Sequence, residues 1–270
     1  MTIVPLDLAA NATPEGLHAF LAQCRAVAQQ AGRPQLVSIS LEVDALDPLA
    51  VLESIFEPDE PHFYAERPDI GTAIAGAEVA LEFEAHGPGR FADVQRWIDD
   101  VLDCTLAVGD VNAPFGGPHF FMSFAFADEV EPGEPFPAGR VFVPRWQVAR
   151  AGAVTTAVAN LAVAADSDLA PLVGRVWQAH AKFRNFEYGK SAGGGTGVPP
   201  VGSDHGRDAR AASYRTHETG DYRAAVGHAL ESIASGEFNK IVLARARDLT
   251  ADRPLHPLQL LNGLRQRFPS

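Results

Sequence analysis

Stretches in which apolar and polar residues strictly alternate are the feature that most constrains how this chain folds. Residues 37–43 (VSISLEV) alternate cleanly, and residues 77–85 repeat the pattern with glutamates on the outward face. Such alternation predicts β-strands with one face toward water. Further apolar runs predict strands at 119–126, 140–148 and 153–163. Helical spacing predicts helices at 14–31, 91–102, 168–186, 222–233 and around 260–265. Strands in runs, without a regular strand–helix–strand order, predict an α+β fold with antiparallel sheets.

Two of the predicted helices carry start and stop signals. Thr13 and Pro14 are typical of a helix start, and Gly32 can end that helix. Asp221 and Gly236 play the same two parts for the helix at 222–233. Cys24 falls on the apolar stripe of the first helix, which favours a core position over a nucleophile.

A glycine- and proline-rich segment divides the chain into regions. Residues 189–212 (GKSAGGGTGVPPVGSDHGRDARAA) have no apolar period and predict a linker or insertion between an N-terminal α+β region, 1–188, and a second region, 213–270. Within the segment, Gly189-Lys190-Ser191 lacks the earlier glycine of a phosphate-binding loop. Ser203-Asp204-His205 are chain neighbours in a loop, which cannot hold the geometry of a catalytic triad.

Composition excludes several classes of protein. The formal net charge is −12, and no basic patch of the kind used for nucleic acid or acidic membranes is present. No stretch approaches the roughly 20 apolar residues that cross a bilayer, and the first residues do not resemble a signal peptide. Two cysteines are too few for a disulfide framework, and the nine histidines show no metal-ligand spacing. The sequence therefore predicts a cytoplasmic protein without nucleic-acid or membrane partners.

Lys240 stands at the start of a run that otherwise predicts a buried strand. In an extended chain, Lys240 shares one face with Phe238 and Val242, while Ile241 and Leu243 lie on the other. Because both faces are largely apolar, the strand is expected to be covered on both sides. A lysine there either extends its ammonium group to water or serves as a base, since partial desolvation lowers the pKa of an amine. The strand alone favours the first interpretation.

The residues around Lys240 resemble a motif of the chorismate-utilising enzymes, specifically of isochorismate synthases. In GEFNKIVLAR (236–245), a glycine–acid pair, a lysine, an aliphatic pair and Leu-Ala-Arg follow one another. PHFYAERPDIGTAIAG, GGPHFFMSFAFAD and GRVFVPRWQV resemble earlier segments of that family, with Met122-Ser123 where the family often has two glycines. The resemblance covers most of the chain but only the N-terminal part of the family's architecture. It implies antiparallel β-sheets stacked as a sandwich with flanking helices, and makes 213–270 the start of the chorismate-binding catalytic region.

The resemblance also implies a reaction and a role for Lys240. An isochorismate synthase converts chorismate to isochorismate with Mg²⁺, for menaquinone or siderophore biosynthesis. The lysine activates the attacking water as general base, whereas ammonia-using relatives usually carry glutamine there. The family's general acid and magnesium-binding glutamates lie in its C-terminal part, so no metal ligand is assigned here. The chain is expected to be truncated and inactive alone, with chorismate and a separate C-terminal catalytic segment as partners. A salicylate synthase, which also eliminates pyruvate, and a non-catalytic fragment are the alternatives.

Overall fold

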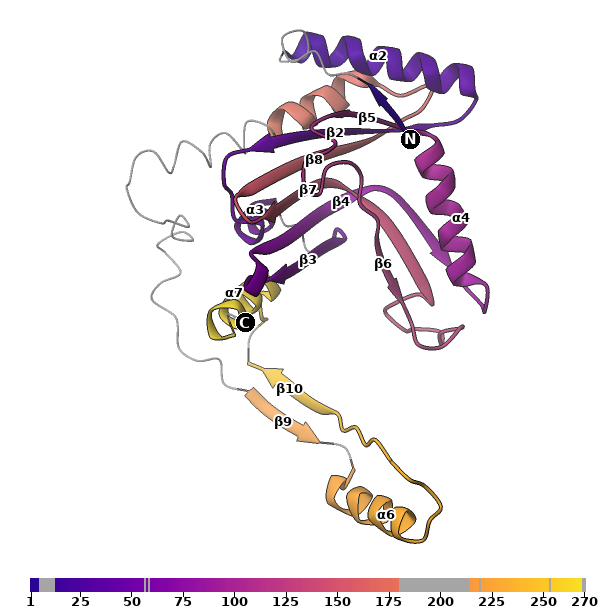
Figure 1. Ribbon diagram of the computed structural model, residues 1–270, viewed down its shortest axis with the longest axis vertical. Coiled ribbons are helices and arrows are strands. Elements are labelled where there is room, and N and C mark those ends of the chain that lie inside the picture. The colour runs from indigo at the N-terminus through magenta and orange to yellow at the C-terminus, as the bar shows by residue number, and fades with distance from the viewer. Residues whose placement is uncertain are drawn as a thin grey trace, which may run out of the picture. The chain divides into compact units, whose positions relative to one another are not determined.

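The chain forms two compact units, which are described separately (Figure 1). The computed structural model describes residues 1–4, 13–55, 57, 59–179, 214–218, 220–252 and 254–268. The first unit comprises Met1–Pro199 with Arg265–Ser270, and the second comprises Pro200–Leu264. The predicted linker at 189–212 lies outside the described residues.

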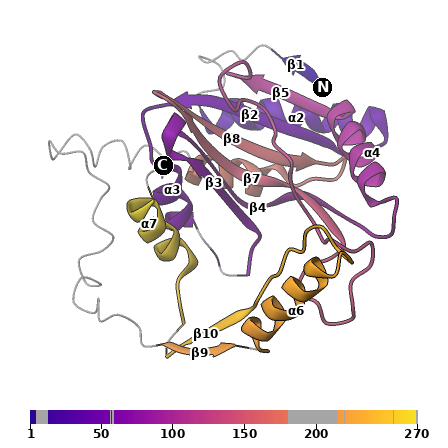
Figure 2. The same cartoon turned by 60° about the horizontal axis from the view of Figure 1, so that its bottom comes forward.

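One mixed sheet of eight strands forms the centre of the first unit. Its strands are β1 (Thr2–Val4), β2 (Gln35–Val43), β3 (His62–Arg67), β4 (Thr72–Ala85), β5 (Thr105–Gly109), β6 (Phe121–Phe124), β7 (Gly139–Ala151) and β8 (Val154–Val163). The order across the sheet is β1-β5-β2-β8-β7-β4-β3 (Figure 2). Strand β6 pairs with β7 (Figure 1). The helices are α2 (Pro14–Ala31), α3 (Pro48–Ile55) and α4 (Arg90–Asp103), with the 3₁₀ turn η1 (Pro68–Ile70). Residues 169–179 are also helical.

The prediction of purely antiparallel, stacked sheets is wrong for this unit. Strand β5 pairs in parallel with both β1 and β2, whereas the other pairs are antiparallel. Parallel strands require a long crossover, and α2 provides one between β1 and β2. Among the described strands, all eight of this unit belong to one sheet, so a sandwich of two stacked sheets is not found within it.

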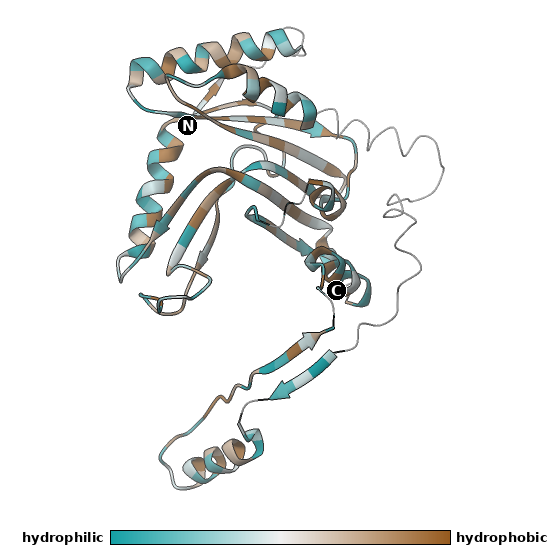
Figure 3. Ribbon diagram, turned by 180° about the vertical axis from the view of Figure 1, so that it is seen from behind, coloured by the Kyte–Doolittle hydropathy of each residue, from teal (hydrophilic) through white to brown (hydrophobic). Residues whose placement is uncertain are grey.

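Helices cover the sheet through apolar clusters. Leu17, Leu21 and Cys24 of α2 pack against Val37 and Leu161, together with the helical residues 169–179. Val94 of α4 packs against Ala85 and Val141 at the other end of the sheet. Apolar and polar residues mix along α2 and α4, as helices with one buried face require (Figure 3). The core position predicted for Cys24 is confirmed, because the residue is only 2% exposed.

The predicted helix start and stop signals are confirmed, and the predictions of burial are confirmed for some strands but not for β2. Helix α2 begins at Pro14, with the Thr13 hydroxyl accepting from the N–H of Gly16 at 3.1 Å, and ends before Gly32 with φ 64°. Glu82 and Glu84 of β4 are exposed as predicted. The wet face predicted for β2 is wrong, because Ser38 and Ser40 are fully buried.

The second unit contains the strands β9 (Tyr214–Glu218) and β10 (Arg247–Ala251), which pair antiparallel, and the helix α6 (Tyr222–Ala234). Helix α7 (Pro257–Arg267) follows, and its last residues are assigned to the first unit. The predicted strand around Lys240 is absent, since residues 240–246 have no regular structure. A strand needs a neighbour for its N–H and C=O groups, and among the described residues of this unit only β9 and β10 pair.

Candidate functional site

Lys240 lies just beyond the C-terminus of α6. The side chain of Asp221 caps the helix by accepting from the N–H groups of Arg223 and Ala224 at 3.0 and 3.1 Å. The helix ends at Ala234, and Gly236 turns the chain with φ 78°. Both predicted signals, Asp221 and Gly236, are therefore confirmed. Because these contacts are local, they fix where the segment with Lys240 begins.

The segment from Phe238 to residue 246 is held at both ends and unpaired between them. At its start, the N–H groups of Glu237 and Phe238 donate to the carbonyl of Ser232 at 3.1 and 3.4 Å. At its end, the chain enters β10 and its ladder with β9. The bonds at the two ends confine a segment whose middle has no regular structure.

Glu218, the last residue of β9, reinforces the C-terminal end of this segment. Its carboxylate forms ion pairs with Arg247 and, at 3.7 Å, with Arg245. The Arg245 guanidinium also lies over the ring of Tyr222, 5.4 Å from its centroid. Arg245 is thus held to both β9 and the first residue of α6.

Lys240 itself is exposed in this unit. The two apolar residues predicted to share its face are exposed as well, with Phe238 at 49% and Val242 at 81%. The apolar covering predicted for the face that carries Lys240 is therefore not formed by the described residues of this unit, whereas Ile241 and Leu243 on the other face are half-buried. A base that depends on desolvation has to obtain that covering from elsewhere.

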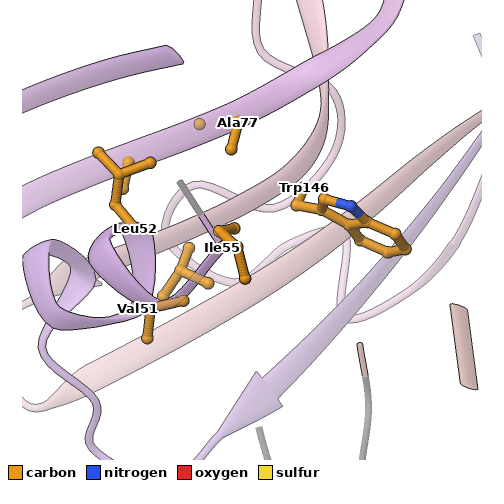
Figure 4. Close-up of a pocket in the computed structure, with 8 residues that line it drawn as sticks. Val51, Leu52, Ile55, Ala77 and Trp146 are labelled. Carbon is orange, nitrogen blue, oxygen red and sulfur yellow. The ribbon is translucent and has the colours of Figure 1, made fainter. Parts of the chain in front are cut away.

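A small apolar pocket lies in the first unit between α3 and the strands β4 and β7 (Figure 4). It is a half-open depression too tight to admit a water molecule, and it is lined by Val51, Leu52, Ile55, Ala75, Gly76, Ala77, Trp146 and Val148. The polar atom of Trp146, Nε1, donates to Glu78 Oε1 at 2.9 Å. A dianion such as chorismate needs cations or hydrogen-bond donors, and no charged residue lines the pocket. This pocket does not have the chemistry of a chorismate site.

No metal centre is found in the part of the chain that the structure describes, and the thiol of Cys24 is buried. No three His, Cys, Asp or Glu side chains there come together in a way that could hold a metal ion. Burial raises the pKa of the Cys24 thiol to about 11, which keeps it protonated near neutral pH. No helix in the same residues is long and apolar enough to cross a membrane.

A buried polar cluster in the first unit was missed at the level of sequence. Ser40 and Gln147, from β2 and β7, are at most 1% exposed, and both bind the backbone of residues 110–120, which cover them. The signal for Gln147 was its place between Trp146 and Val148 in the predicted strand 140–148. Ser40 gave no such signal, because the alternation of residues 37–43 places the serines on the face predicted to contact water.

Comparison with known proteins identifies the family. The model of the chorismate binding enzyme family matches residues 19–270. The salicylate biosynthesis isochorismate synthase of Pseudomonas aeruginosa is 29% identical over 245 residues, which are 88% of this chain and 46% of that protein. MenF, the menaquinone-specific isochorismate synthase from Escherichia coli, shares the fold with a TM-score of 0.51 and 16% identity, over 92% of this chain and 50% of that one. The chain spans about half the length of these relatives. Because the family model matches nearly the whole sequence, the chain belongs to the chorismate-binding enzyme family.

Proposed function

We propose that this chain carries the N-terminal part and the base-bearing segment of an isochorismate synthase, which converts chorismate to isochorismate. The family match over residues 19–270 is the observation that carries this proposal. Two relatives named as isochorismate synthases, and the motif GEFNKIVLAR around Lys240, support the reaction. One relative is named for salicylate biosynthesis and the other for menaquinone, so the proposal includes both the siderophore and the menaquinone pathway.

Lys240 is the proposed general base of the reaction. Its neutral amine takes a proton from the water that attacks the chorismate ring, while the ring hydroxyl leaves. The water oxygen forms the new C–O bond as the old C–O bond breaks, so substrate and product are isomers. To be neutral near physiological pH, the amine needs an apolar enclosure. We infer that this enclosure forms when residues 238–246 gain a neighbouring strand, which would bring Phe238 and Val242 out of water.

The other half of the chemistry needs groups that are not assigned to this chain. Chorismate is a dianion, and the departing hydroxyl needs an acid or a cation. The formal net charge of −12 offers no general positive field to gather such a substrate. Mg²⁺ is the proposed cofactor of the complete enzyme, and no described residue is given to it as a ligand. A C-terminal catalytic segment is the proposed source of the acid.

Product analysis of the complete enzyme tests the function. The enzyme would be incubated with chorismate and Mg²⁺, and the products separated by chromatography. Isochorismate as the sole product is the expected result. Salicylate formed without an added lyase would show a salicylate synthase, and a folded protein that leaves chorismate unchanged would show a non-catalytic member of the family. The reading frame downstream of residue 270 identifies which polypeptide has to be included.

A further inference from the structure

The segment between β5 and β6, residues 110–120, is tied to the sheet by side chains that lie beneath it. Three side chains from three strands bind its backbone: Ser40 of β2 accepts from the N–H of Gly117 at 2.8 Å, Thr156 of β8 donates to the carbonyl of Pro114 at 2.7 Å, and Gln147 of β7 donates to the carbonyl of Phe115 at 3.1 Å. All three side chains are at most 1% exposed. We call residues 110–120 the clamp segment, because these bonds hold it over the sheet.

The clamp segment is locally strained. Phe115 has φ 60°, a left-handed conformation that is uncommon for residues other than glycine. At Gly116, a Cβ atom would meet the carbonyl oxygens of Asp110 and Val111 at 2.6 Å, so the turn leaves no room for a side chain. Such conformations persist when surrounding bonds fix them. The Gln147 bond to the Phe115 carbonyl is one of those bonds.

His119, at the end of the clamp segment, shares its Nδ1 atom between two competing partners. Nδ1 lies 3.1 Å from Gln147 Nε2 and 3.3 Å from the carbonyl oxygen of Gly117. The Phe115 carbonyl can only accept, so the Gln147 atom that binds it is the amide nitrogen. The second N–H of the same nitrogen then points to His119 Nδ1, which has to be unprotonated to accept it. The arrangement therefore fixes neutral His119 with its proton on Nε2.

Protonation of His119 reverses these preferences. A protonated Nδ1 can only donate, so it binds the Gly117 carbonyl and no longer accepts from Gln147. Gln147 has one NH₂ group and one oxygen, and its Oε1 is buried without a hydrogen-bond partner among the described residues. Rotating the amide would let Oε1 accept from the imidazolium, but it would turn the NH₂ group away from Phe115. The carbonyl of Phe115, the residue with the left-handed conformation, would then lose its hydrogen-bond donor.

The surroundings of His119 favour the neutral form. Burial lowers the pKa of His119 below its ordinary 6.5, and the Gly117 carbonyl opposes this more weakly. Two charged side chains on the elements around it have other partners. Asp110 accepts from the N–H of Glu42 at 2.8 Å, and Arg145 of β7 is paired with Glu78 at 3.0 Å. No charged group is among the causes of the shift, so burial sets its direction.

We propose that His119 and Gln147 form a pH-sensitive latch, which holds the clamp segment on the sheet at neutral pH and releases it in acid. The sign follows from linkage. Because the folded pKa lies below the unfolded value of about 6.5, the folded state binds fewer protons than the unfolded chain. The stabilisation from neutral His119 is complete above the unfolded pKa. It is lost as the pH falls below that value and through the lower pKa of the folded chain. This device acts independently of the reaction proposed for Lys240.

Amide hydrogen exchange of the full chain, read by mass spectrometry, tests the latch. Protection factors, corrected for the intrinsic pH dependence of exchange, would be compared at about pH 7.5 and about pH 5 for a peptide covering the clamp segment. Protection there is expected to be lost in acid, because protonated His119 no longer accepts from Gln147. A peptide from α4 is the internal control and should keep its protection.

The matched variant is His119→Asn, whose side-chain oxygen replaces Nδ1 as an acceptor but does not titrate. In this variant the clamp segment should be equally protected at both pH values. Equal protection at both pH values in the native chain would overturn the proposal, as would the same acid-induced loss in His119→Asn. Circular dichroism checks the fold of the variant. If His119→Asn does not fold, His119→Gln takes its place, and the native comparison still decides the question.

Discussion

The ion pair between Arg265 and Asp47 gives the most direct test of how the first unit is held together. The two terminal nitrogens of the Arg265 guanidinium, Nη1 and Nη2, donate to Asp47, each at 2.9 Å, and the two side chains are only 22% and 19% exposed. At an effective dielectric constant near 20, charges about 4 Å apart attract by about 4 kcal/mol, and desolvation offsets a large part of this. Asp47 also caps α3, with Oδ1 accepting from the N–H of Leu49 at 3.2 Å.

The substitutions can separate the charge from the cap. Asp47→Asn removes the charge and keeps a good capping group, so we expect a loss of about 1–2 kcal/mol in the free energy of unfolding. Asp47→Ala also removes the cap and should cost about 1 kcal/mol more. Arg265→Met should cost about 2–4 kcal/mol, because it leaves Asp47 beside Glu66, whose carboxylate is 9% exposed and 3.7 Å from Arg265.

Urea unfolding followed by tryptophan fluorescence measures these losses. Trp97, Trp146 and Trp177 all belong to the first unit, so the signal reports that unit. In a double-mutant cycle of Asp47→Asn with Arg265→Met, a coupling energy of at least about 1 kcal/mol is expected. A coupling below about 1 kcal/mol, the range of an exposed pair, would refute the argument that burial strengthens this contact.

Three further predictions concern the proposed chemistry and the core. In the complete enzyme, Lys240→Gln should lower kcat by about 10²–10⁴-fold with little change in chorismate binding. The control Lys190→Gln removes the same charge outside the motif and should leave kcat unchanged. Near-normal turnover of Lys240→Gln in steady-state kinetics would contradict the role of Lys240 as base. The purified 270-residue chain, incubated with chorismate and Mg²⁺, should give no isochorismate by chromatography, and robust turnover would show that the acid lies within it. Because burial raises the pKa of Cys24 to about 11, a thiol reagent near pH 7 should modify it only on unfolding, and rapid labelling in the folded chain, located by peptide mass mapping, would refute this.

Features that depend on neighbouring residues in the chain were predictable from sequence, and those that depend on distant residues were not. The Thr13 and Asp221 caps were found because a cap and its partners lie within three residues. Strand β5 (Thr105–Gly109) was missed because five residues are too few to show an alternation of apolar and polar side chains. The parallel pairing of β5 was missed for the same reason. The burial of Ser40 was also hidden, since its bond to Gly117 joins residues 77 apart.

The same reasoning explains why Lys240 could be singled out but its surroundings could not. The alternation of Phe238, Lys240 and Val242 describes a strand, yet a strand exists only with a partner for its backbone. In this unit the segment is fixed by α6 at one end and by β10 at the other, and it exposes the apolar side chains that should cover the amine. If Lys240 is the base, pairing of residues 238–246 both orders the backbone and desolvates the amine. The pairing that turns residues 238–246 into a strand would then also lower the pKa of the Lys240 amine. An exposed lysine in this unit is therefore compatible with the proposed catalytic role in the complete enzyme.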